Sequence, residues 1–264
     1  MPELPDVEIF RRYLNATALH QEIETVRVHH DRVLKGVSKA TLQRRLKGQA
    51  LEQTARHGKH LFASLTKKGW LMLHFGMTGF LRYFQVEDKK PGHVRMEVLF
   101  SNGYRLAYDC QRMLGQVSLV KDPYTFAEKE KLGPDALEDL DFDTFRTAVS
   151  GRRGAIKSTL MNQEVVAGIG NIYSDEILFQ ARLHPATAAN ALTEEDLENL
   201  HRAIGRVMKE AIDAGADPEA MPDDFLLPRR SEGVSCPRCG DSVKKITISG
   251  RNGYYCPKCQ KKGR

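Results

Sequence analysis

The first residues carry a group that could act as a nucleophile. The chain starts Met1-Pro2-Glu3, and removal of the initiator methionine before a small residue would leave Pro2 with a free secondary amine. An α-amine has a pKa near 8, whereas a lysine side chain has one near 10.4, so the amine is partly unprotonated at neutral pH. Such an amine can attack an electrophilic carbon, for example C1′ of a sugar, and form a Schiff base. Glu3, its neighbour, could transfer protons in that reaction.

Four of the five cysteines form two pairs near the C-terminus. Cys236 and Cys239 make one C-x-x-C pair, Cys256 and Cys259 make the other, and sixteen residues separate the pairs. This spacing is typical of a tetrahedral zinc site with four thiolate ligands and no open coordination position, so we expect one structural zinc ion. The alternative, a pair of disulfides, is disfavoured because the chain has no secretion signal. Cys110 is expected to be a small buried apolar side chain.

The segment around these cysteines is the most basic part of the chain. The formal net charge is +6, yet residues 230–264 alone carry +7 and residues 1–229 carry −1. Between the cysteine pairs, the sequence predicts a β-hairpin with strands at 244–248 and 254–255 and a turn at 249–253. Arg251 in that turn could enter a groove or bind a phosphate, which favours a nucleic-acid partner. The alternative is a zinc ribbon that contacts protein.

Composition places the chain among globular proteins. It has 264 residues, of which 41% are hydrophobic and 28% charged, enough for one large domain or two modest ones. No run of about 18 consecutive apolar residues is present, and the N-terminus lacks the apolar core of a signal peptide. We therefore expect a soluble cytoplasmic protein that does not contact a membrane.

Hydrophobic periodicity separates a strand-rich part of the chain from a helical part. Short helices are expected over 6–14 and 39–46, and the strands and turns between about 22 and 120 predict an antiparallel β-sandwich or barrel. Beyond Pro123 the period becomes helical, with a capped helix start at Thr193 and a polar, proline-containing linker after Gly215. The strands most clearly expected are 60–66, 70–75, 79–85, 94–100 and 104–108, and the helices are 142–149, 155–161, 173–181 and one that includes 197–211.

Four motifs, in order along the chain, resemble the formamidopyrimidine-DNA glycosylase/endonuclease VIII family. They are MPELPDVE at 1–8, HFGMTG at 74–79, GIGNIYSDE at 168–176, and the two C-x-x-C pairs followed by Gln260. The resemblance implies an α+β multidomain fold, with an N-terminal antiparallel β-sandwich behind a leading helix and a C-terminal helix–two-turn–helix domain plus a zinc-finger hairpin. The implied boundaries are 1–122 for the sandwich, 123–216 for the helical domain, 217–231 for the linker and 232–264 for the zinc finger.

The resemblance also implies an activity, namely a bifunctional DNA glycosylase/AP lyase that removes oxidised bases in base-excision repair. In this family, the residue matching Pro2 forms the Schiff base, and the residue matching Glu3 assists base loss and proton transfer. Lys59 matches a catalytic lysine that binds a phosphate or stabilises negative charge. The Schiff base would permit β- and then δ-elimination of the strand. The implied partner is damaged double-stranded DNA, bound by a monomer that needs no nucleotide cofactor.

Further DNA contacts follow from the same resemblance. Met77 matches the residue that fills the space left when the damaged nucleotide leaves the stack. Asn171 lies in a glycine-rich turn whose amides, with the N-terminus of the following helix, are expected to hold a phosphate. Lys157 matches a further phosphate contact, and Arg251 of the zinc hairpin is expected to hold phosphate from the other side.

The chain departs from the family pattern at two places. The family motif Asp-Pro-Arg-Arg-Phe-Gly supplies the other residues that fill the space, but residues 109–115 read Asp-Cys-Gln-Arg-Met-Leu-Gly. Arg112, with either Met113 or Leu114, is expected in that role. The linker lacks the Tyr-Gly-Arg pattern that accompanies a loop over an oxidised purine. The pattern therefore leaves 8-oxoguanine, ring-opened purines and oxidised pyrimidines open as substrates.

A second function of another class is also open. The chain could be a non-catalytic binder of damaged or abasic DNA, which would bind with a strong dependence on salt and leave strands uncut. In either case, we expect a protein of the bacterial cytoplasm that acts at the nucleoid. Retention of Met1 would block the amine of Pro2.

Overall fold

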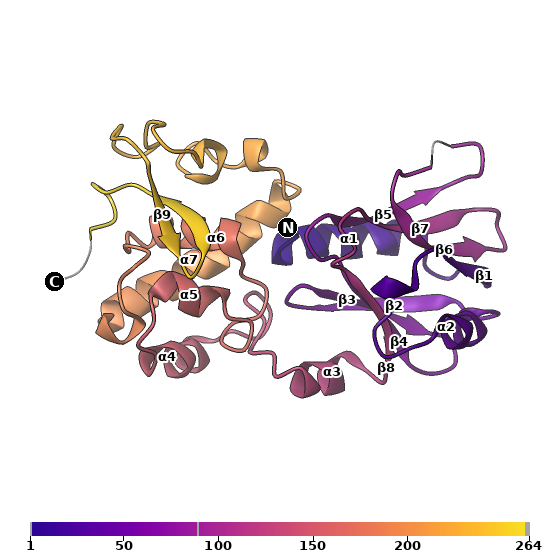
Figure 1. Cartoon of the computed structure of the whole chain (residues 1–264). Helices are drawn as coiled ribbons and strands as arrows, with labels where there is room; N and C mark the ends of the chain where they lie inside the picture. The colour runs from indigo at the N-terminus through magenta and orange to yellow at the C-terminus, as the bar shows by residue number, and fades with distance from the viewer. Residues whose placement is uncertain (1, 89, 262–264) are drawn as a thin grey trace. The chain divides into compact units, whose positions relative to one another are not determined.

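The computed structural model describes residues 2–88 and 90–261, so Met1 lies outside the described residues, as do the last three residues of the predicted zinc finger. The described chain falls into two compact units (Figure 1). The first unit contains Pro2 and Asp6–Glu130. The second contains Glu3–Pro5 and residues 131–261.

The first unit is built from two four-stranded antiparallel sheets. The strand orders are β1-β6-β7-β5 and β2-β3-β4-β8. Figure 1 shows the two sheets as separate groups of arrows, with α1 running along them. The elements are α1 (Leu4–Thr17), β1 (Ile23–Val28), a 3₁₀ turn (Asp31–Val33), α2 (Lys39–Leu46), β2 (Leu51–His57), β3 (His60–Leu65), β4 (Trp70–His74), β5 (Gly79–Phe84), β6 (Val94–Phe100), β7 (Arg105–Cys110), β8 (Gln116–Val120) and α3 (Pro123–Lys129).

The hydrophobic core of this unit joins both sheets to the leading helix. Val7 and Leu14 of α1 are fully buried in one cluster with residues of both sheets, among them Leu61, Leu73 and Val98. Each such side chain contributes about 1.5–3 kcal/mol by leaving water. Cys110 belongs to the same cluster and is fully buried, as predicted. The α+β class and the β-sandwich with a leading helix are therefore confirmed.

The second unit is helical and ends in a two-stranded hairpin. Thr193 and Asp196 form a capping box at the start of the long helix α7, as the sequence signal indicates. Among the helices within residues 2–88 and 90–261, none combines the length and the apolar composition of a membrane span. The elements are α4 (Phe142–Ser150), α5 (Ile156–Met161), α6 (Asn171–Gln180), a 3₁₀ turn (Ala189–Ala191), α7 (Glu194–Asp213), 3₁₀ turns at Pro218–Ala220 and Leu227–Arg229, β9 (Lys244–Ile248) and β10 (Arg251–Tyr255).

Two segments differ from their sequence predictions. The segment expected to be a polar linker, 217–231, contains Phe225 and Leu226, both fully buried; its three consecutive apolar residues are too few to show a period among prolines and acids. The hairpin turn is two residues, Ser249 and Gly250, with φ of 50° and 72°, which suits the turn that matches strand twist. Arg251 therefore pairs with Ile248 as the first residue of β10 and is not at the tip.

A buried hydroxyl connects the two sheets beside the loop that follows β4. The Tyr108 hydroxyl on β7 donates a 2.7 Å hydrogen bond to the carbonyl of His74 on β4. Burial raises the pKa of this phenol well above its usual range. Gly115 leaves room for it, since a Cβ there would lie 1.8 Å from the Tyr108 hydroxyl oxygen. This bond fixes the position from which the chain leaves β4 toward residues 76–79.

We expect Tyr108→Phe to lower the free energy of unfolding of the first unit by about 1–3 kcal/mol, because a buried carbonyl loses its donor. Urea titration followed by the fluorescence of Trp70, the single tryptophan of the chain and the first residue of β4, measures this. Tyr124→Phe, at a side chain that is 73% exposed, is the matched control and should change stability by less than about 0.5 kcal/mol. Equal midpoints for both variants would contradict the expectation.

Candidate active site and metal centre

Backbone amides at the start of α6 hold Glu3. Its carboxylate accepts N–H groups from Gly170 and Ile172, both at 2.8 Å, and from Tyr173 at 3.2 Å. The residue is 1% exposed. The N-terminus of a helix presents unpaired N–H groups and a partial positive charge, which suit a carboxylate. The prediction of a DNA phosphate on these amides is therefore wrong, because the protein's own Glu3 occupies them.

Two glycines of the turn before α6 make room for the N-terminal residues. A Cβ on Gly170 would lie 2.3 Å from Cδ of Glu3, and a Cβ on Gly168 would lie 2.6 Å from Cδ1 of Leu4. The Leu4 N–H donates to the Gly168 carbonyl at 3.0 Å. We call this binding site for Glu3 and Leu4, formed by residues 168–173, the Glu3 seat. Because Pro2 is bonded to Glu3, the Glu3 seat restricts where the amine of Pro2 can lie. Pro2 itself is half-buried.

Asp175 is a buried anion that joins four segments of the second unit. Its carboxylate, 1% exposed, accepts from Nζ of Lys157 on α5 at 2.6 Å and from Nε of Arg230 at 2.9 Å. The backbone N–H of Tyr254 on β10 donates to it at 3.1 Å. Three donors on one carboxylate offset the cost of burying its charge. Asp175 thereby ties α5, the segment before the zinc finger and the hairpin to α6.

Lys157 differs from its sequence prediction. A phosphate contact needs an accessible ammonium, but Lys157 is 0% exposed. Besides Asp175, its Nζ donates to the backbone carbonyl of Asn171 at 3.0 Å and to the Ser174 hydroxyl at 2.9 Å. Burial lowers the pKa of Lys157, and the Asp175 carboxylate opposes that shift. The predicted phosphate contact is therefore corrected to a supporting position beneath Asn171.

Asn171 connects the start of α6 to the hairpin. Its Nδ2 donates to the backbone carbonyl of Asn252 on β10 at 2.9 Å. Its Oδ1 is a buried acceptor with no hydrogen-bond donor in the described structure. Arg251, the next residue toward the turn, is exposed, and its guanidinium lies 3.8 Å from the Met161 sulfur. The structure thus brings together Asn171 and Arg251, both predicted to contact DNA, and it orients them from α6 and β10.

The four predicted zinc ligands come together at the base of the hairpin. The sulfur atoms of Cys236, Cys239, Cys256 and Cys259 all lie within 4.8 Å of one another. Two of these distances are 3.5 and 3.9 Å, close to the roughly 3.8 Å edge of a tetrahedron with 2.3 Å Zn–S bonds. The donor set and its size fit one zinc ion. Held by four thiolates, the ion would supply structure and leave no position for a substrate.

In the first unit, Lys59 occupies the turn between β2 and β3 and is 8% exposed. Arg56, at the end of β2, is buried beside it, with its guanidinium 3.3 Å from the Gly58 carbonyl and 3.4 Å from the carboxylate of Glu8 on α1. Burial alone would raise the pKa of Glu8, but Arg11 and the neighbouring guanidinium groups outweigh it and lower the pKa. The turn that carries Lys59 is thus anchored to α1.

Met77 lies at the tip of the turn between β4 and β5 and is 38% exposed. A second loop packs against it: the Arg112 N–H donates to the Thr78 hydroxyl at 3.3 Å. In that loop Met113 has φ 51° and packs on the core, whereas Leu114 is 47% exposed. In this loop, therefore, Leu114 is exposed, whereas Met113 is partly buried against the core.

Sequence reasoning missed two half-buried histidines behind this loop, whose Nδ1 atoms are buried. His60 on β3 and His74 on β4 are directly paired in the sheet, with ring centroids 5.0 Å apart. Burial, with the charge of His74, lowers the pKa of His60 to about 3; burial, with the charge of Lys59, lowers the pKa of His74 to about 4. Strand alternation in the HFGM motif could have indicated an inward His74, but the partner is set by the register of β3 and β4.

These histidines predict acid sensitivity in the first unit. An unfolded histidine has a pKa near 6.5, so below about pH 6.5 the unfolded chain binds protons that the folded chain does not. Stability is then lost as the pH falls, with a slope approaching about 1.4 kcal/mol per pH unit for each histidine. Urea titrations followed by Trp70 fluorescence at pH 7, 6 and 5 measure it.

In His60→Gln, the free energy of unfolding should fall less steeply as the pH is lowered, because the contribution of His60 to the slope is removed. His30→Gln is the matched control, because His30 is exposed, and should keep the full slope. The same slope in both variants would refute the assignment.

Comparison with known proteins covers almost the whole chain. Residues 1–117 match the formamidopyrimidine-DNA glycosylase N-terminal domain, residues 132–221 match its H2TH domain, and residues 235–262 match a zinc finger found in FPG and IleRS. A formamidopyrimidine-DNA glycosylase of Streptococcus pyogenes serotype M3 is 35% identical over 279 residues, covering 99% of each chain.

Solved structures agree with the sequence matches. The Lactococcus lactis Fpg in complex with DNA that contains an abasic site has a TM-score of 0.90 at 29% identity, over 98% of this chain and 100% of that one. Its complex with FAPY-dG-containing DNA gives the same values. With this likeness along its whole length, and with the cysteine cluster and the α5–α6 turn in place, the chain belongs to the formamidopyrimidine-DNA glycosylase family.

Proposed function

We propose that this chain excises oxidised bases from double-stranded DNA through a Schiff base on Pro2 and then cuts the strand by β- and δ-elimination. Its family is one of base-excision repair glycosylases with AP lyase activity. The observation that carries the catalytic assignment is the seat of Glu3 on the amides of α6, directly beside the amine-bearing residue. A non-catalytic DNA binder is not favoured.

The chemistry needs an unprotonated amine and a group that moves protons. After removal of Met1, the nitrogen of Pro2 attacks C1′ of the damaged nucleotide, and the bond from C1′ to the base breaks as the base leaves with a proton. The bond from C1′ to O4′ then opens, O4′ takes the proton that the Pro2 nitrogen gives up, and a Schiff base between C1′ and Pro2 remains. Glu3 assists the departure of the base and the later proton transfers. Three backbone N–H groups bind its carboxylate, and they hold the otherwise flexible Glu3 side chain in one position. Lys59 supplies a cation for a phosphate or for developing negative charge.

Residues of both units bind the DNA in this proposal. Met77 fills the space left by the flipped nucleotide, and Arg112 and Leu114 fill the rest of it, since Leu114 is the exposed member of its pair. Asn171 and Arg251 bind phosphates. Lys157 acts through Asn171, whose carbonyl it supports. One zinc ion on the four cysteines holds β9 and β10, and with them Arg251.

The relatives support one substrate class. Their name and the FAPY-dG complex of the Lactococcus lactis Fpg support formamidopyrimidine lesions as the first substrate. We place the protein at the bacterial nucleoid and assign 1–122 to catalysis, 123–216 and the hairpin within 232–264 to DNA binding, and 217–231 to the connection between them. Arg230, at the end of that connection, also fixes Asp175.

Borohydride reduction should trap a covalent complex between the mature chain and a duplex that contains an abasic site, because reduction of the Schiff base makes it permanent. Mass spectrometry of the digested adduct should place the DNA fragment on the N-terminal peptide. A variant with an N-terminal extension, whose Pro2 nitrogen is an amide, should give no adduct. Lys59→Arg keeps the charge and should still be trapped.

An adduct on Lys59, or trapping that survives the N-terminal extension, would contradict the role of Pro2. N-terminal mass measurement of the same sample establishes whether Met1 has been removed, so a blocked amine is distinguished from an inactive one.

A further inference from the structure

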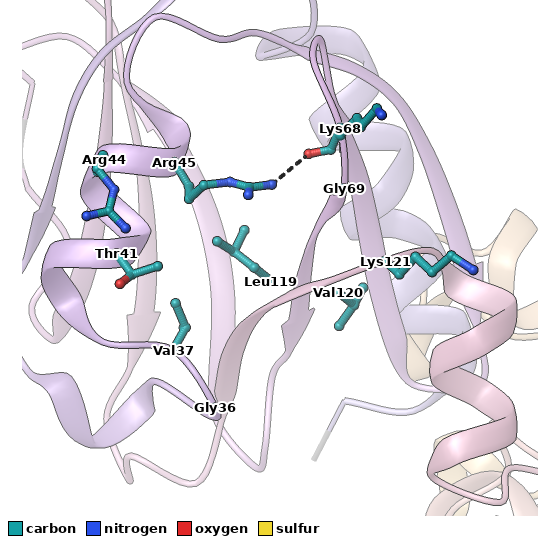
Figure 2. Close-up of a pocket in the computed structure, with 10 residues that line it drawn as sticks. All are labelled: Gly36, Val37, Thr41, Arg44, Arg45, Lys68, Gly69, Leu119, Val120 and Lys121. Carbon is teal, nitrogen blue, oxygen red and sulfur yellow. Dashed lines mark hydrogen bonds between the residues drawn. The ribbon is translucent and has the colours of Figure 1, made fainter.

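A strongly basic groove lies on the first unit, away from the residues assigned to catalysis. It has a volume of about 580 Å³ and is lined by α2, the turn between β3 and β4, and the end of β8. Arg44 and Arg45 of α2 lie on one side, and Lys68 and Lys121 on the other (Figure 2). A second hollow of about 400 Å³ shares the two arginines and Lys68 and adds Lys47 and Lys67. The two hollows form one continuous basic surface.

The charges on this surface are unbalanced. Neither hollow is lined by an aspartate or a glutamate. Within the described chain, the side chains of Arg44, Lys68 and Lys121 form no ion pair, and Arg45 donates only to the Lys68 carbonyl, at 3.2 Å. The nearest carboxylate in sequence, Asp122, accepts from Thr125 as the cap of α3; these hydrogen bonds, and to a smaller extent the charge of Lys121, lower its pKa. Cationic residues gathered around a groove without acidic neighbours in its lining favour anions there.

The groove is separated from Lys59 by the length of a strand. Lys59 precedes β3, whereas the turn with Lys67 and Lys68 follows it, and a six-residue strand spans about 16 Å. Gly69 lines the groove, and from the next residue, Trp70, β4 runs to His74 and then to the turn with Met77. An anion in the groove therefore lies at the opposite end of this sheet from the lesion-contacting residues of the first unit.

The lining also selects the kind of anion. No aromatic residue lines either hollow, whereas proteins that bind single strands stack bases on aromatic side chains. None of the exposed large hydrophobic side chains of the described chain lies there, so the surface lacks the apolar anchors of a membrane-binding face. Cations without stacking groups suit the phosphate backbone of a duplex, whose recognition needs no base contact.

We propose that this groove binds the phosphate backbone of a second DNA duplex segment while the first is held for repair. The inference rests on the proposed function only for the location of the first duplex. A protein with two phosphate-binding faces can contact a neighbouring segment before releasing the first, which favours transfer between segments during the search for damage.

The test first fills the catalytic site with one duplex and then measures whether the complex binds a second duplex. The chain is trapped with borohydride on a 15-base-pair abasic duplex, purified, and titrated with a fluorescein-labelled undamaged 15-base-pair duplex, with anisotropy read at 50 and 200 mM salt. The trapped complex should bind the second duplex, and binding should weaken with salt. Arg44→Glu with Lys68→Glu should weaken it by at least about tenfold at 50 mM salt, with trapping unchanged.

The matched control is Arg27→Glu with Arg82→Glu, which makes the same charge change at exposed positions of the other sheet, on β1 and β5. It should bind the second duplex like the parent chain. No second duplex on the parent complex, an equal loss in the control, or binding to phosphatidylserine vesicles without duplex binding would overturn the proposal. If no trapped complex forms, the proposed function fails. In that case, the number of duplexes bound per free chain tests the groove proposal. Two duplexes per chain support it, and one overturns it.

Discussion

The arrangement of the second unit around the N-terminus depends on one interaction, the carboxylate of Glu3 on the amides that begin α6. A helix N-terminus is a strong site for an anion, and here the anion comes from the residue after the proposed nucleophile. The glycines of the preceding turn are needed because a side chain at Gly170 or Gly168 would occupy the space of Glu3 or Leu4. One electrostatic contact therefore explains the glycine motif and restricts the amine of Pro2.

A second buried charge organises the proposed DNA-binding face. Asp175 lies one turn into α6 and draws in Lys157, Arg230 and the backbone of Tyr254. Removing one partner of such a network leaves a buried charge without compensation, which is more costly than losing a surface ion pair. Together with the zinc site, the network orients Asn171 and Arg251 from elements that are far apart in sequence.

The parts of the structure that depend on residues close together in the chain could be predicted from the sequence. The cysteine spacing predicts the metal site, hydrophobic period predicts the sandwich and helices, and the capping box predicts the start of α7. The Glu3 seat was not predictable, because its partners lie 167 to 170 positions away in the chain. The burial of Lys157 depends on a carboxylate from another helix. The choice of Leu114 over Met113 depends on a positive φ at Met113. The basic groove was hidden because residues 1–229 are nearly neutral in sum, while residues 39–68 hold eight Lys/Arg and one Glu.

The most direct measurement is the rate of borohydride trapping on an abasic duplex by Gly170→Ala, whose added methyl would displace Glu3. The account predicts a rate about 10²-fold slower than that of the parent chain, with affinity for abasic DNA within about threefold. Gly205→Ala on α7, where a Cβ meets nothing within 4 Å, is the matched control and should trap at the parent rate. An unchanged trapping rate in Gly170→Ala would contradict the claim that the amides of α6 position the catalytic N-terminus.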